Sequence, residues 1–183
     1  MAKVIAIAGS PSHPSRSYAV LEEAQRILLT QGIHLDILLV RDLPAEALLQ
    51  AQFDHPAIAA ATAQVVTADA VILSTPVYKA AYTGILKAFL DLLPQKALVG
   101  KPILPIATGG TLAHLLAIDY ALNPVLGVLG ATQILQGVYL VDTQFQRFEQ
   151  GGIEFQDPEL ETRFHTALTE FAQTLTTKVP TPV

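Results

Sequence analysis

The stretch Val4-Ile5-Ala6-Ile7-Ala8-Gly9-Ser10-Pro11-Ser12-His13-Pro14-Ser15-Arg16-Ser17 decides the fold. Its first five residues are small or branched and apolar, which predicts a strand buried on both faces. The next nine contain one Gly, two Pro and four Ser, and helical spacing begins at Tyr18. A strand, a hydroxyl-rich loop and a helix N-terminus together offer free N–H groups, hydroxyls and the positive end of a helix dipole. We therefore predict an anion-binding loop, to which Arg16 adds a fixed charge.

The spacing within this loop limits the anion that it can bind. The loop matches neither G-x-G-x-x-G nor G-x-x-x-x-G-K-[ST], so it is neither a dinucleotide fingerprint nor a triphosphate P-loop. A terminal monophosphate surrounded by hydroxyls, like that of FMN, fits it better. The alternative is that Gly and Ser only turn the chain and that Ser15 or Ser17 caps the helix.

Composition excludes several classes of protein. The 183 residues suit one domain; 51% are apolar and only 15% are charged, which favours an apolar surface hidden against another subunit. The net charge of −5 argues against nucleic acid or an anionic membrane as partner. The absence of cysteine excludes disulfides and thiolate metal sites. No run of residues is long enough to span a membrane, and we expect a cytoplasmic protein.

Strands and helices alternate along the rest of the chain. Further strands are predicted at 34–40, 69–75, 103–107 and 133–141, and helices at 18–29, 57–68, 86–93, 112–129 and 160–175. The alternation predicts an α/β domain over residues 1–177, with a five-stranded parallel sheet in the order 2-1-3-4-5 and helices on both faces. We expect residues 41–55 to be irregular or weakly helical, 144–156 to form a small hairpin, and 178–183 to be a flexible tail.

The helix predicted at 112–129 is apolar on nearly its whole circumference, which is typical of a helix buried on all sides. We expect its outer face, with Leu115 and Leu126, to form a subunit interface. Pro124 lies in its path and cannot donate a hydrogen bond to the carbonyl of Tyr120. The sequence therefore predicts a kink, a π-bulge or a break at residues 120–123.

Three loops rich in Gly, Pro and hydroxyls follow strands and meet at one crevice if the predicted strand order holds. They are the serine loop (residues 9–17), residues 76–84 and residues 108–111. The five histidines lack the spacing of metal ligands, and no serine stands in a G-x-S-x-G elbow. A flavin needs no acid or base from the protein for hydride transfer. The N–H groups of Gly109 and Gly110 could face its polar edge, and Tyr78 or Tyr82 could wall the ring or simply pack at the rim.

Four motifs in this order resemble the NADPH-dependent FMN reductase family, and most of all the reductase component of the two-component alkanesulfonate monooxygenase system. They are Gly9-Ser-Pro…Ser15-Arg-Ser17, Thr75-Pro-Val-Tyr-Lys-Ala-Ala-Tyr82, Gly84…Leu86-Lys87…Asp91-Leu-Leu-Pro94 and Ala107-Thr-Gly-Gly-Thr…Ala113-His-Leu-Leu-Ala…Asp119-Tyr-Ala-Leu122. The resemblance runs from Val4 to about Gly137.

The resemblance implies a flavodoxin-like fold, a homodimer or homotetramer, and reduction of FMN by NADPH for an FMNH2-dependent monooxygenase that serves sulfur acquisition. It assigns the flavin phosphate to Ser10, Ser15, Arg16 and Ser17. It assigns the ring to Pro76, Val77, Tyr78 and Lys79, and the polar edge of the ring to Thr108, Gly109 and Gly110. It also places Tyr120 in a π-bulge at the subunit interface, where flavin exchange is controlled. No motif covers residues 142–157.

Two other functions on the same fold stay open from the sequence. One is an electron carrier that retains FMN, and the other is an NAD(P)H:quinone or azo reductase. The choice between NADPH and NADH is open as well, because four cationic residues are candidate partners of a 2′-phosphate: Arg16, Arg41, Lys79 and Lys101.

Overall fold

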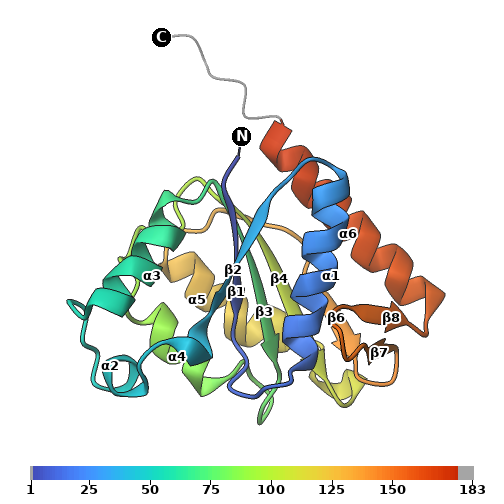
Figure 1. The fold of residues 1–183 in the computed structure, drawn as a ribbon, viewed down its shortest axis with the longest axis horizontal. Helices are drawn as coiled ribbons and strands as arrows, with labels where there is room; N and C mark the ends of the chain where they lie inside the picture. Colours follow the sequence, from blue (N-terminus) through green and yellow to red (C-terminus); the bar gives the residue numbers. More distant parts are fainter. Residues whose placement is uncertain (1, 177–183) are drawn as a thin grey trace.

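The computed structural model of the chain describes residues 2–176, and its centre is a parallel sheet (Figure 1). The strands are β1 (Val4–Ala8), β2 (Leu35–Leu39), β3 (Ala70–Pro76), β4 (Pro102–Gly109), β5 (Gln133–Ile134) and β6 (Val138–Val141). They are ordered β2-β1-β3-β4, and both β5 and β6 pair with the far side of β4. The predicted flavodoxin-like order is confirmed, with β2 at the edge.

The last strand differs from the prediction of one continuous strand over residues 133–141. β5 pairs with Pro102 and Ile103, and β6 begins again opposite Ile106, so the three residues 135–137 face only two on β4. This extra residue is a β-bulge. Gly137 lies in it, and a Cβ there would be 2.8 Å from Ile118 Cγ2. The glycine therefore lets the segment around Ile118 lie close against the sheet.

Helices cover both faces of the sheet, as expected. α1 (Arg16–Thr30) and α6 (Pro158–Thr176) pack on one face, and α3 (Pro56–Thr67), α4 (Gly84–Leu90) and α5 (Asn123–Val128) pack on the other (Figure 1). Alternate residues of β1 enter the two cores, because strand side chains point to opposite faces in turn. Val4, Ala6 and Ala8 join the first core, whereas Ile5 and Ile7 join the second.

The shorter elements agree with the sequence in most places. Residues 40–42 form a 3-10 turn, followed by α2 (Ala45–Leu49), in the region expected to be weakly helical. α4 ends at Leu90 rather than at residue 93. The predicted hairpin exists as β7 (Phe145–Arg147) and β8 (Ile153–Phe155). The tail predicted at 178–183 lies outside the described residues. Within residues 2–176, no helix has both the length and the apolar character needed to cross a membrane.

The segment predicted as one helix at 112–129 is broken into three parts. A 3-10 turn (Leu112–His114) and a π-helix (Ile118–Leu122) precede α5, so the π-helical form is the one present among the three irregularities that the sequence left open. Pro124 stands in the first turn of α5, where its missing N–H costs little. Leu126 is fully buried and was wrongly expected on the outer face. That face instead exposes five apolar side chains: Leu112, Leu115, Leu116, Tyr120 and Val128.

Candidate active site

A cavity of about 630 Å³ opens where β1, β3, β4 and β6 end. The chain passes from β1 to β2 on one side and then to β3 on the other, and ligands bind at such a switch point in open α/β sheets. The cavity brings together all but one of the residues that the resemblance assigned to flavin: Ser10, Ser15, Arg16, Ser17, Pro76, Val77, Tyr78, Thr108, Gly109 and Gly110. The exception is Lys79. Hereafter this cavity is called the active-site pocket.

The serine loop supplies buried hydroxyls at the N-terminus of α1. Ser15 is the N-cap, and its Oγ accepts the N–H of Tyr18 at 3.3 Å. The Ser15 and Ser17 hydroxyls are hydrogen-bonded to each other at 3.0 Å, and Ser10 pairs with Ser12 at 3.1 Å. Ser15 and Ser17 are largely buried, and so is Ser10. Buried hydroxyls beside a helix N-terminus are suited to a phosphate, so these residues fit the terminal phosphate of FMN.

Thr83, the residue before α4, holds this loop in place. Its Oγ1 donates to the carbonyl of Gly9 and accepts the N–H of Leu86 at 3.2 Å, and it caps α4. A Cβ at Gly9 would be 2.9 Å from Leu86 Cδ2, so glycine is needed for this approach. Sequence reasoning missed Thr83, although a threonine before a Gly-initiated helix is a common capping signal.

We expect Thr83→Val to lower the free energy of unfolding by about 1–3 kcal/mol, because it removes a cap and leaves the buried Gly9 carbonyl without its donor. Thr83→Ser retains the hydroxyl and is the matched control. Urea unfolding followed by circular dichroism measures both. A Thr83→Val variant that is as stable as wild type would show that the hydroxyl of Thr83 does not stabilise the loop.

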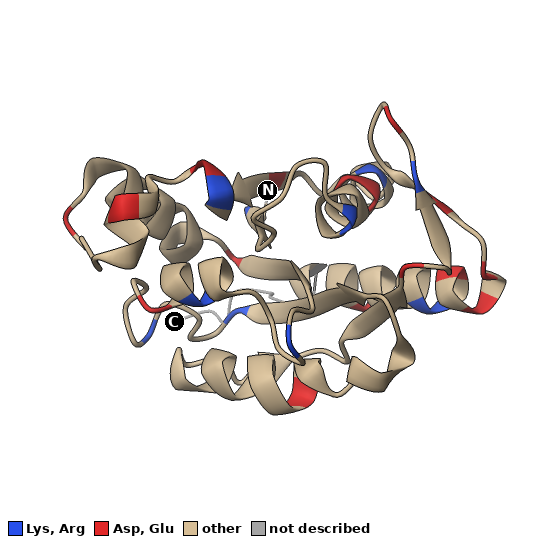
Figure 2. Ribbon diagram, turned by 90° about the horizontal axis from the view of Figure 1, so that it is seen from below, with Lys and Arg blue, Asp and Glu red and all other residues tan. Residues whose placement is uncertain are grey.

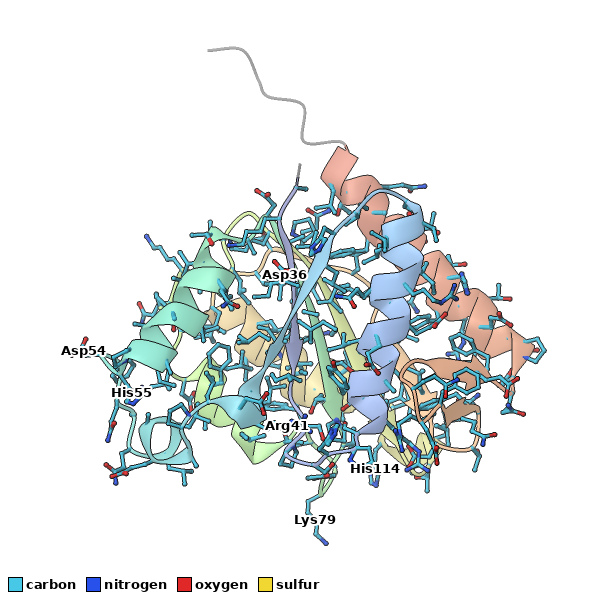
Figure 3. All side chains as sticks on the ribbon, viewed as in Figure 1. Asp36, Arg41, Asp54, His55, Lys79 and His114 are labelled. Carbon is cyan, nitrogen blue, oxygen red and sulfur yellow. The ribbon has the colours of Figure 1, made fainter. Side chains whose placement is uncertain are left out.

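The residues after β3 form a tight turn that separates Tyr78 from Lys79. Tyr78 N donates to the carbonyl of Ala81 at 2.8 Å, and Ala81 N donates back at 3.2 Å. Lys79 and Ala80 form the turn with φ of 51° and 65°, which is the left-handed pattern of a type I′ hairpin. Lys79 therefore points away from the molecule (Figure 3) and does not line the active-site pocket.

The two tyrosines expected near the ring, Tyr78 and Tyr82, lie in different parts of the structure. Tyr78 lines the active-site pocket and is about half exposed. Tyr82 packs against the core beneath α3 and α4, and this burial raises the pKa of its phenol. Tyr82 therefore does not wall the active-site pocket, whereas Tyr78 does.

The loop after β4 is held by three hydrogen bonds. Val77 N donates to the carbonyl of Thr108 at 2.8 Å, and Asp142 N donates to that of Gly109 at 2.9 Å. The Tyr139 hydroxyl donates to the Thr111 carbonyl at 2.8 Å. Burial raises the pKa of Tyr139, and the negative charge of Asp142 raises it further, so the phenol keeps its proton at neutral pH. The pocket floor is thus preorganised by its neighbouring strands.

The β7–β8 hairpin forms a wall of the active-site pocket that the sequence did not reveal. Asp142, Phe145, Gln146 and Arg147 all line the cavity. The hairpin is tied to α1 because Gly152 N donates to Glu22 Oε2 at 3.1 Å. It is tied to α6 as well, since Gln144 Nε2 donates to Asp157 at 2.5 Å.

The cationic candidates for a 2′-phosphate occupy different places. Arg16 lines the active-site pocket. Arg41 lies close to it but donates to the Ser12 carbonyl at 3.0 Å, so it holds the serine loop. Lys101 precedes the amino end of β4, at the edge of the sheet opposite the active-site pocket, and donates to the Val66 carbonyl. It is therefore too far from the pocket to bind a 2′-phosphate there. Figure 2 faces the edge with the active-site pocket, and most of the ribbon seen there is uncharged.

No group of three or more His, Cys, Asp or Glu side chains in residues 2–176 is arranged to hold a metal ion.

A family model described as NADPH-dependent FMN reductase matches residues 2–146. The chain belongs to this family. As an FMN reductase, it is an oxidoreductase that uses FMN and NADPH.

Individual relatives agree with this assignment. The chain is 49% identical to an FMN reductase (NADPH) of Escherichia coli K12, over 94% of this chain and 90% of that one. It is 46% identical to an FMN reductase (NADPH) of Pseudomonas putida KT2440, over 98% and 91%. Among solved structures, the apo form of an NADH:FMN oxidoreductase (EMOB) superposes on this FMN reductase with a TM-score of 0.87 at 36% identity, covering 98% and 92%.

Proposed function

We propose that this FMN reductase binds FMN as an exchangeable substrate in the active-site pocket and supplies the reduced flavin to a separate FMNH2-dependent monooxygenase. The observation that carries the proposal is the convergence of the three loops on one cavity of about 630 Å³, a volume typical of nucleotide-sized ligands. The resemblance to the alkanesulfonate system adds the monooxygenase partner and a role in sulfur acquisition.

Different residues of the active-site pocket bind different parts of the flavin. Ser10, Ser15, Arg16 and Ser17 bind the phosphate through hydroxyls, helix N–H groups and a guanidinium. Pro76, Val77 and Tyr78 contact the ring, and the backbone of Thr108, Gly109 and Gly110 donates to its polar edge. When bound, FMN accepts hydride at its ring. The protein positions that ring and stabilises the negative charge that grows on its edge.

Exchange of the flavin agrees with how open the site is. Arg16 has a side chain that is 55% exposed, and Tyr78 is also exposed at the rim. A cofactor that is retained is normally enclosed on most of its surface. We therefore expect reduced flavin to leave the protein after each turnover.

This expectation is tested by anaerobic filtration. Protein is mixed with NADPH and an excess of FMN, and the reduced flavin is measured on both sides of a membrane that retains the protein. We expect most reduced flavin in the filtrate, in many-fold excess over protein. Reduced flavin that stays with the protein at one equivalent, with little turnover beyond it, would identify an electron carrier instead.

The outer face of the 112–129 segment is proposed as the interface of a homodimer or homotetramer, with Tyr120 on it controlling flavin exchange as the resemblance implies. Five apolar side chains are exposed there, and Tyr120 is the most exposed of them. Leu116→Glu should shift the protein to smaller species in sedimentation velocity, because a charge would be buried without a partner. Leu49→Glu changes an exposed leucine on α2 and should leave the mass unchanged. Equal masses for wild type and Leu116→Glu would contradict the interface.

A further inference from the structure

Asp142 is the one carboxylate among the described residues that line the active-site pocket. It comes directly after β6, and the other charged residues of the lining are Arg16 and Arg147. Its Oδ2 lies 3.7 Å from Nη1 of Arg16, the cation assigned above to the flavin phosphate. An anion thus stands beside the group that is meant to bind another anion.

The geometry of this ion pair does not fix Arg16. The two groups make a single contact at 3.7 Å, and both side chains are partly exposed, 55% for Arg16 and 33% for Asp142. Arg26 and Glu23 differ, because two guanidinium nitrogens reach the two carboxylate oxygens at 3.1 and 2.5 Å. Paired contacts of that kind hold an arginine in one orientation. Asp142 attracts Arg16 without positioning it.

The backbone of Asp142, in contrast, is well held. Its N–H donates to the carbonyl of Gly109 at 2.9 Å, and the preceding Val141 N donates to Gln144 Oε1 at 3.0 Å. The backbone therefore keeps Asp142 at the pocket wall whether or not Arg16 moves. It already acts on Tyr139, whose pKa is raised by burial and further by Asp142.

We propose that Asp142 competes with the flavin phosphate for Arg16 and so weakens the binding of FMN, which keeps the flavin exchangeable. A phosphate monoester carries about −1.5 to −2 charges at neutral pH. When it binds Arg16 it displaces Asp142 and leaves two anions close together at the mouth of the pocket, where their repulsion favours release. The inference rests on the proposed function, since it concerns how the same site releases its product.

The test compares the dissociation constants of FMN and riboflavin for wild type, Asp142→Asn and Asp36→Asn. Riboflavin lacks the phosphate. The Asp36→Asn substitution removes an equal charge from the exposed edge strand β2, away from the pocket (Figure 3). We expect Asp142→Asn to bind FMN about tenfold more tightly than wild type does, a difference of about 1.4 kcal/mol. Its dissociation constant for riboflavin should equal that of wild type. Asp36→Asn should change neither constant. The gain for FMN should shrink at high salt, because both groups are partly exposed.

Three results would overturn the inference. Weaker FMN binding by Asp142→Asn would mean that the carboxylate orients Arg16 for the phosphate. Unchanged FMN binding would mean that Asp142 has no influence on the flavin. Equal tightening of FMN and riboflavin would place the effect away from the phosphate. A wild-type protein that binds neither flavin would instead remove the proposed function itself, and this outcome differs from the other three.

Discussion

Replacing Arg16 with Gln should raise the KM for FMN by about ten- to a hundredfold while the KM for riboflavin stays within about twofold. A charge-assisted hydrogen bond to phosphate contributes about 1.5–3 kcal/mol, and each 1.4 kcal/mol is a factor of ten in binding. Arg16 is the cation at the start of α1, and it lines the active-site pocket beside buried Ser15 and Ser17. The measurement is steady-state NADPH oxidation with each flavin varied in turn.

The contrast between the two flavins is the internal control for Arg16→Gln. A second control is Lys96→Gln, which removes the same charge from an exposed position before the amino end of β4. It should leave both KM values unchanged. If Arg16→Gln raised the KM for riboflavin as much as that for FMN, Arg16 would act on the shape of the pocket and the phosphate assignment would be wrong.

Gly109→Ala is expected to lower kcat/KM for FMN by about ten- to a hundredfold. A Cβ at this position would lie 2.2 Å from the Tyr139 hydroxyl oxygen and 3.1 Å from Cζ, so the loop or the phenol must move. Displacements of about 1 Å at a reacting site cost rates of this order. The movement would also break the hydrogen bond from Tyr139 to the Thr111 carbonyl.

Tyr139→Phe removes the atom that the new methyl group meets, so it should partly rescue Gly109→Ala. We expect the double variant to lie closer to wild type than Gly109→Ala alone, a coupling that a double-mutant cycle measures. Gly84→Ala is the matched control, because a Cβ there has no neighbour within 4 Å. A double variant that is as poor as Gly109→Ala would show that the alanine interferes with the flavin itself rather than with Tyr139.

The sequence predicted the parts of the site that are local in the chain. The run of apolar residues before Gly9 specifies a doubly buried strand, and the following serines specify a capped helix start. Both follow from neighbouring residues, and the structure has β1, the loop and α1 where they were expected. The π-helix was predictable for the same reason, because Pro124 alone rules out a regular helix through Tyr120.

The remaining wall of the active-site pocket depends on contacts between distant residues. Phe145, Gln146 and Arg147 form no motif, and they reach the cavity because Glu22 on α1 holds the hairpin through Gly152. One signal was available, since Asp142 follows a strand at the same sheet edge as the other loops. Lys79 shows the opposite case, because it adjoins Tyr78 in the sequence but a two-residue turn directs its side chain away from the pocket.

We propose that FMN is a diffusing substrate of this FMN reductase. The most direct test is the rate of NADPH oxidation as a function of added FMN, measured on dialysed protein whose flavin content is known, with a quinone as the alternative acceptor. We expect little bound flavin and a rate that rises with FMN to saturation and exceeds the rate with quinone. Tightly bound flavin, with quinone-dependent turnover that added FMN does not change, would contradict it.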